Sequence, residues 1–158
     1  MYLLDSDVFI QAKNLHYGFD IVPAFWDWLV TSHAAGRLFT VERVAQEVIA
    51  GGDDLADWMR ARPASFILKP TADDAPALQR VSVWANSAGY RQGAAATFLS
   101  SGDYYLVSQA LSLGYTIVTH EVASPASEKR IKIPDACRAV RVPSMSPFQM
   151  LRAEGARF

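Results

Sequence analysis

MYLLDSDVFI, residues 1–10, is the stretch that decides the fold of this chain. An apolar run over residues 2–4 leads into Asp5, and after Asp7 the chain becomes apolar again over residues 8–10. Burying an unpaired carboxylate is costly, so the pattern predicts a buried strand that ends at Asp5, with its carboxylate at the carboxyl edge of a sheet. Open α/β folds bind their ligands at that edge. A metal ion is the simplest partner that would keep a carboxylate ionised there.

Strand and helix patterns alternate along the rest of the chain. Further strands are predicted at 38–41, 66–68, 115–119 and 140–142, with a short extended piece at 130–133. Helices are predicted at 23–35, before Gly51, after Asp53, after Asp73 or Asp74, from Asp103 to Gly114, at 134–139 and from Ser146 onward. A loop with a short helix is expected at 88–102. This alternation predicts an α/β fold, a three-layer α/β/α sandwich with a short parallel sheet.

Length and composition narrow the class of protein. A chain of 158 residues suits one domain over residues 1–158, and 51% hydrophobic with 20% charged residues indicates a globular protein. The single Cys137 excludes an internal disulfide framework. No apolar stretch reaches membrane-spanning length, and we expect no signal peptide at the N-terminus. A cytoplasmic protein is therefore expected.

The net charge of −1 conceals an uneven distribution. Residues 1–128 carry eight basic and fourteen acidic side chains, whereas residues 129–158 carry seven basic and two acidic ones. Such a chain can hold a metal in its acidic part and a polyanion near its basic part. Ordinary surface charge is the competing interpretation of the basic tail.

Four carboxylates fall near expected strand ends and helix starts: Asp5, Glu47, Asp103 and Glu121. In a parallel sheet these points share one edge, although Glu47 joins only if its helix face turns that way. Clustered carboxylates repel one another, and a divalent cation removes that penalty. Oxygen ligands suit Mg²⁺ or Mn²⁺, and two such ions can activate a water and stabilise a leaving oxygen of a phosphodiester.

Each acid also has a structural interpretation. Asp103 follows Gly102 and is well placed as a helix N-cap. Glu47 alone fits a solvated helix residue, and Glu121 alone fits a loop charge. Asp7 either orients Asp5 or a water at the metal, or caps the turn after the strand.

The motifs LLDSDVFI, VAQEVIAG, GDYYLVSQAL and IVTHE together resemble those of the PIN-domain nucleases, over residues 2 to about 121. This resemblance implies a metal site made of Asp5, Glu47, Asp103 and Glu121, with Ser6, Asp7 and Thr119 in supporting positions. Asp7 stands where the family more often has Asn, and Glu121 where it more often has Asp. The stretches FDIVPAFWDWL and KIPDACRAVRVPSMSPFQML resemble a PIN-like subfamily of bacterial and archaeal proteins.

The resemblance implies a function and partners. It implies an endoribonuclease that leaves 5′-phosphate and 3′-hydroxyl ends, acting as the toxin of a toxin–antitoxin pair. A protein antitoxin that blocks the acidic edge, and a homodimer, are expected with it. Four basic residues are candidates for RNA phosphate contacts: Arg91, Lys129, Arg130 and Lys132. A solvated charged loop explains them equally well.

Two other functions compete with the nuclease. LLDSDV also resembles the first motif of haloacid-dehalogenase-type phosphatases, with Asp5 as nucleophile and Asp7 as acid/base. Val8 and Phe9, however, replace the Gly-Thr pair usual there, and no strand-associated Lys follows. A catalytically silent binding module that keeps the PIN fold is the other alternative. RNA binding without cleavage, in any divalent metal, would indicate such a module.

Overall fold

The computed structural model describes all residues, 1–158, and contains a five-stranded sheet. The strands are β1 (Tyr2–Leu4), β2 (Leu38–Val41), β3 (Ile67–Leu68), β4 (Thr116–Val118) and β5 (Ser144–Met145). Their order across the sheet is β3-β2-β1-β4-β5, and every neighbouring pair is parallel. The predicted parallel sheet is therefore confirmed.

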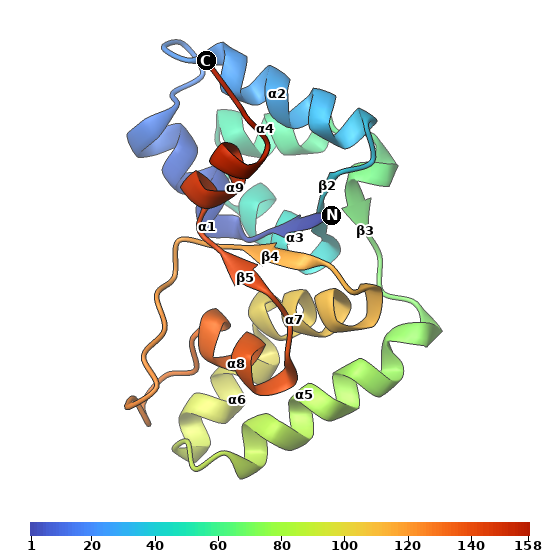
Figure 1. The fold of residues 1–158 in the computed structure, drawn as a ribbon, viewed down its shortest axis with the longest axis vertical. Helices are drawn as coiled ribbons and strands as arrows, with labels where there is room; N and C mark the ends of the chain where they lie inside the picture. The colour runs from blue at the N-terminus through green and yellow to red at the C-terminus, as the bar shows by residue number, and fades with distance from the viewer.

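Helices cover both faces of this sheet. They are α1 (Ser6–Gln11), α2 (Pro23–Ala34), α3 (Glu42–Ala50), α4 (Asp54–Arg60), α5 (Ala75–Ser87), α6 (Gln92–Ser100), α7 (Gly102–Leu113), α8 (Ile133–Val140) and α9 (Pro147–Ala153). A π-helix covers Ala12–His16, and 3₁₀ turns cover Ala64–Phe66 and Ala72–Asp74. Figure 1 shows the sheet between α1, α2, α4 and α9 on one side and α5 to α8 on the other. No helix is long and apolar enough to span a membrane.

The central strands are apolar because helices bury both of their faces. Leu3 and Leu4 of β1, and Ile117 and Val118 of β4, have no exposed surface. They belong to one continuous cluster of 32 buried hydrophobic residues that runs through the sheet. Strands buried on both faces have this near-continuous apolar character, and polar residues follow only where β1 and β4 end.

Local signals set several helix ends as predicted. Asp53 caps α4, its side chain accepting a hydrogen bond from the Ala56 amide. Gly114 ends α7 in the left-handed conformation, with φ of 69°. Ser146 and Gln149 form a reciprocal capping box at the start of α9.

Other local predictions are wrong. The last strand lies at Ser144–Met145 and not at 140–142, because Val140 completes α8 and Arg141 adopts a left-handed φ of 63°. Residues 130–132 form a loop, and Ile133 already begins α8. The helix α1 directly after Asp5 was not predicted, since the hydrophobic pattern there is too short to show a helical period.

Candidate active site

The acidic site lies where the connections of the sheet reverse direction. From β1 the chain builds β2 and β3 on one side, and it then returns to build β4 and β5 on the other. The carboxyl ends of β1 and β4 are paired neighbours at the point where the connections change direction. The Asp5 amide donates a hydrogen bond to the Val118 carbonyl at 3.0 Å. Ligands of open α/β sheets bind at such a switch point.

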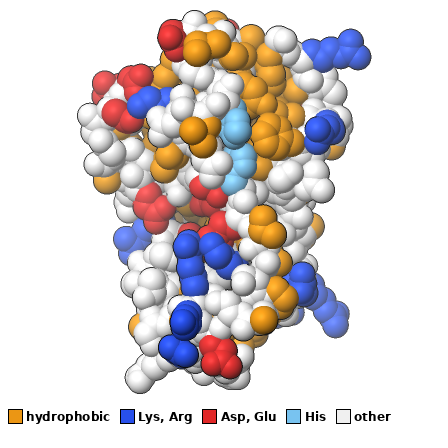
Figure 2. Space-filling model, turned by 90° about the vertical axis from the view of Figure 1, so that its left-hand side faces the viewer, with side chains coloured by type: hydrophobic (Ala, Val, Ile, Leu, Met, Phe, Trp, Pro, Cys, Tyr) orange, Lys and Arg blue, Asp and Glu red, His pale blue; other side chains and the backbone are white.

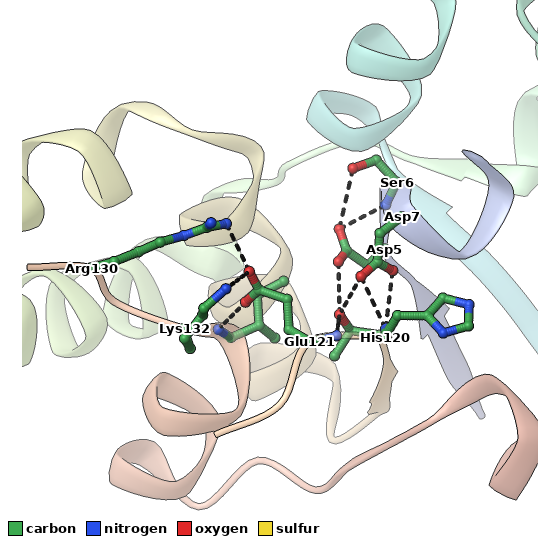
Figure 3. A network of polar contacts seen from close by, with 9 residues as sticks. Asp5, Ser6, Asp7, His120, Glu121, Arg130 and Lys132 are labelled. Atoms are coloured by element: carbon green, nitrogen blue, oxygen red, sulfur yellow. Dashed lines mark hydrogen bonds and ion pairs between the residues drawn. The ribbon is translucent and has the colours of Figure 1, made fainter. Parts of the chain in front are cut away.

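Asp5 is held rigidly at this edge (Figure 3). Only 3% of its surface is exposed. Its Oδ1 accepts a hydrogen bond from the Ser6 amide at 2.7 Å, with Ser6 Oγ at 3.4 Å, and this contact also caps α1. Its Oδ2 accepts from Thr119 Oγ1 at 2.9 Å. None of the ion pairs of the protein involves Asp5, so hydrogen bonds alone hold this buried carboxylate.

Thr119 links the two acidic residues of the first motif. Its Oγ1 lies 2.9 Å from Asp5 Oδ2 and 3.1 Å from Asp7 Oδ2, and it accepts the Glu121 amide at 3.0 Å. Both oxygens of Asp7 also accept the His120 amide, at 3.0 and 3.1 Å. Asp7 thus fastens the turn after β4 to the start of α1, and Thr119 aligns Asp5.

Thr119→Val should weaken binding of a divalent cation at this edge about 10-fold or more. Valine keeps the shape of the side chain but removes the hydroxyl that aligns Asp5, and outer partners of metal ligands are typically worth 10–100-fold. Thr119→Ser, which keeps the hydroxyl, should retain most of the affinity. Calorimetric titration with Mn²⁺ compares the two variants, and equal losses in both would show that the hydroxyl has no specific role.

Glu47 joins the site through a backbone contact between two helices. It lies on α3, and its Oε1 accepts the Gly102 amide at 3.0 Å, at the first residue of α7. A Cβ atom on Gly102 would lie 2.5 Å from Glu47 Oε1 and 3.0 Å from its Cδ, so only glycine fits without displacing the carboxylate. The condition that the α3 face turns toward the acidic edge is met. Gly102 was not predicted as a site residue, although the Gly-Asp pair at the helix start was its signal.

Gly102→Ala should therefore weaken binding of a divalent cation by about 10–100-fold by displacing Glu47, the range expected for losing a partner that orients a ligand. Gly93→Ala is the matched control, since Gly93 also lies near a helix start and a Cβ there meets nothing within 4 Å. That control should bind the cation like the wild type and gain about 0.5–1 kcal/mol of stability, because alanine favours a helix. Calorimetric titration with Mn²⁺ and thermal unfolding would separate the two variants.

Asp103 lies in the first turn of α7, whose N-cap is Ser101. Asp103 is therefore not the cap itself. Burial raises the pKa of Asp103 to about 6, and the Glu121 and Glu47 carboxylates add to this shift. Burial likewise raises the pKa of Asp5 well above its ordinary value, with Asp7 and Asp103 contributing. The acids are thus close enough to disfavour one another's charge.

This donor set fits a divalent cation in its chemistry. Asp5, Glu47 and Asp103 present carboxylate oxygens, which Mg²⁺ and Mn²⁺ prefer, and none of them has an ion-pair partner. A cation would offset the burial and the mutual repulsion that raise the pKa values of Asp5 and Asp103. No three of the acidic, histidine or cysteine side chains converge tightly enough to form a ready-made metal cage. The site is an acidic edge that suits a cation rather than a closed chelate.

Glu121 has different partners from the other acids (Figure 3). Its Oε1 accepts from Arg130 at 2.8 Å and Lys132 at 3.0 Å, and its Oε2 accepts the Ile133 amide at 2.8 Å. Its side chain is only 11% exposed. The structure therefore brings Glu121 near Asp103 but occupies both of its oxygens with donors from the protein.

Three of the four predicted basic residues line a cavity beside the acids. It has a volume of about 730 Å³ and lies between α6 and the loop before α8. Its charged lining residues are Arg91, Asp103, Lys129 and Arg130. Lys132 does not line it and instead pairs with Glu121. Figure 2 shows acidic side chains at the middle of this face with Lys and Arg directly below them.

Histidines do not add to the cluster of acids. The imidazole of His120 stacks on that of His16, with ring centres 5.7 Å apart, and meets the edge of Phe148. His33 is buried and hydrogen-bonded to the Leu38 carbonyl and to Ser65, as a structural residue. Cys137 is likewise a buried core residue.

The protein is a three-layer α/β protein with an acidic edge where two parallel strands end. The sequence matches the family described as Domain of unknown function (DUF4411) over residues 2–158, and the chain belongs to that family. No curated protein matches it. Among solved structures it is similar to FitAB bound to an IR36 DNA fragment, with a TM-score of 0.58 and 17% identity, over 94% of this chain and 96% of that one. This likeness confirms the PIN-like fold predicted from the motifs.

Proposed function

We propose that this protein is a divalent-metal-dependent endoribonuclease. The observation that supports it most is the gathering of Asp5, Glu47 and Asp103, from three distant segments, at the switch point of a parallel sheet. Asp5 is buried and Asp103 is half-buried, and a structural role would not require two such carboxylates to repel each other without an ion-pair partner. The unfavourable free energy of bringing these like charges together is explained if a bound cation offsets it.

Mg²⁺ or Mn²⁺ bound at this open edge, attracted by the carboxylates of Asp5, Glu47 and Asp103, would supply the Lewis acid that activates a water and offsets charge on the phosphate. The protein fixes where the carboxylate oxygens lie. The Ser6 amide and the Thr119 hydroxyl fix Asp5, and the Gly102 amide fixes Glu47.

The cavity beside Asp103 would take the phosphate backbone of the substrate. Arg91, Lys129 and Arg130 place cationic side chains along it. Contacts of this kind orient a nucleic acid without reading its sequence. They would therefore bring a phosphodiester to the acidic edge.

The experiment that tests this function incubates the purified protein with labelled single-stranded and structured RNA, and with DNA of the same sequences. Each is combined with Mn²⁺, Mg²⁺ or EDTA. We expect RNA fragments with 5′-phosphate and 3′-hydroxyl ends in the metal reactions and intact RNA in EDTA. Binding of RNA without cleavage in either metal would support a silent binding module instead.

The cellular role that we propose is a toxin restrained by a protein antitoxin. The resemblance of the sequence to the toxin-type subfamily supports it. Expression of this chain alone should arrest bacterial growth, and Asp5→Asn should relieve the arrest. Growth arrest that persists with Asp5→Asn would contradict a toxin that acts through this site.

A further inference from the structure

Glu121 closes the long loop between β4 and α8. It is separated from the end of β4 by two residues, and its Oε2 accepts the amide of Ile133, the first residue of α8. A single side chain thus ties together the two ends of the segment 122–132, which we call the basic loop. Its three basic residues are Lys129, Arg130 and Lys132.

The other contacts of the basic loop fix its path over the protein. The Ser124 amide donates to the buried carboxylate of Asp135 at 2.7 Å, again at the start of α8. The Arg91 amide donates to the Glu128 carbonyl at 3.0 Å and so joins the loop to the start of α6. These contacts guide its backbone, whereas Glu121 forms the ion pairs with two of its cationic side chains, Arg130 and Lys132.

Glu121 also fixes the direction of two of those side chains. Arg130 and Lys132 both donate to Oε1, at 2.8 and 3.0 Å. The Arg130 side chain remains 65% exposed and lines the cavity beside Asp103. An ion pair with an exposed arginine adds little to the stability of the protein. The main consequence of this contact is therefore the direction in which the guanidinium points.

The ion pairs of Glu121 argue against a ligand role. Its negative charge is already matched by Arg130 and Lys132, which both donate to Oε1, while the Ile133 amide donates to Oε2. Freeing either oxygen for a cation would leave Lys132 or the Ile133 amide without its partner. Asp5, Glu47 and Asp103 face no such competition from Lys or Arg.

We propose that Glu121 is a positioning residue and not a metal ligand: it clasps the basic loop through Lys132 and the Ile133 amide, and it holds Arg130 at the acidic edge, where the guanidinium orients the phosphate backbone of the substrate. The substrate part of this inference rests on the proposed nuclease function, but the clasp itself does not. Glu121 then acts on the reaction only through the basic loop and Arg130.

The test compares Glu121→Gln with Asp103→Asn and with Glu128→Gln, an exposed acid of the same loop. Two readouts need no activity. Calorimetric titration with Mn²⁺ should give Glu121→Gln a Kd within about 3-fold of wild type, whereas Asp103→Asn should weaken binding about 10-fold or more. Limited trypsin digestion should cut after Lys129, Arg130 and Lys132 at least several-fold faster in Glu121→Gln than in wild type or Glu128→Gln.

The activity arm then tests positioning. Glu121→Gln should lower kcat/KM for RNA about 10-fold, and excess Mn²⁺ should not restore it. Adding Glu121→Gln to an Arg130→Gln/Lys132→Gln protein should lower kcat/KM little further, because residues that act through one another give non-additive effects. That double variant also supplies the positioning test if Glu121→Gln fails to fold.

Weakened Mn²⁺ binding in Glu121→Gln, together with activity restored by excess Mn²⁺, would overturn the proposal and make Glu121 a ligand. An unchanged trypsin pattern would overturn the clasp. If the wild-type protein cuts no RNA, the proposed function fails, but the Mn²⁺ and trypsin measurements still decide the role of Glu121.

Discussion

Asp5→Asn is expected to lower RNA cleavage by about 100-fold or more while the protein remains folded. Asparagine has the same shape and keeps an oxygen for the Ser6 amide, but it removes the charge that would attract the cation at the most buried position of the site. Even outer partners of metal ligands are worth 10–100-fold, so a ligand itself should be worth at least as much. Initial cleavage rates at saturating Mn²⁺, with circular dichroism to confirm folding, measure the effect.

Two comparisons make this result specific. Asp27→Asn, at an exposed position on α2, should cleave RNA like the wild type. Asp103→Asn should lose activity to a similar extent, and the Asp5→Asn/Asp103→Asn protein should lose little more, because residues that serve one site are strongly non-additive. Cleavage that survives in both single variants would indicate a contaminating nuclease and remove the support for this site.

The parts of the fold that the sequence predicts well are those with strong local signals. The apolar runs before Asp5 and Thr119 mark strands buried on both faces, and the order of elements requires a parallel sheet. The position of Asp5 at a strand end follows from the cost of burying charge. The short strand Ser144–Met145 has no such pattern, because it has only two residues and lies at the edge of the sheet, where it pairs with β4 alone.

The candidate site is only partly visible in the sequence. Asp5 follows a strand and Asp103 lies at the start of a helix. Both positions can be predicted from the sequence pattern, and so can their approach to each other. The position of the Glu47 carboxylate depends on the packing of α3 against α7. The partners of Glu121 depend on the path of an eleven-residue loop. Neither has a local pattern, because both are set by tertiary contacts between distant segments.

Asp103→Asn should also stabilise the metal-free protein at neutral pH. Burial and the neighbouring acids raise the pKa of Asp103 from 3.8 to about 6. The folded state therefore binds more protons than the unfolded state between these values, and the free energy of unfolding falls as the pH rises through this range. The full difference is worth about 3 kcal/mol above pH 6. Removing an acid from the first turn of α7 costs up to about 1 kcal/mol of stability. The net gain in the free energy of unfolding is therefore about 2 kcal/mol.

Denaturant unfolding in EDTA, at pH 7.5 and at pH 4, measures this gain. At pH 4 Asp103 is protonated in the folded wild type, so the advantage of Asp103→Asn should shrink below about 1 kcal/mol. Asp73→Asn, at an exposed acid in another first turn, should show no such gain. Mn²⁺ should act in the opposite direction, since a ligand at 100 times its Kd stabilises the wild type by about 2.7 kcal/mol and so offsets the advantage of the variant. Lower stability of Asp103→Asn in EDTA at pH 7.5 would mean that Asp103 supports the fold, and the argument that these carboxylates are kept for a cation would lose its energetic basis.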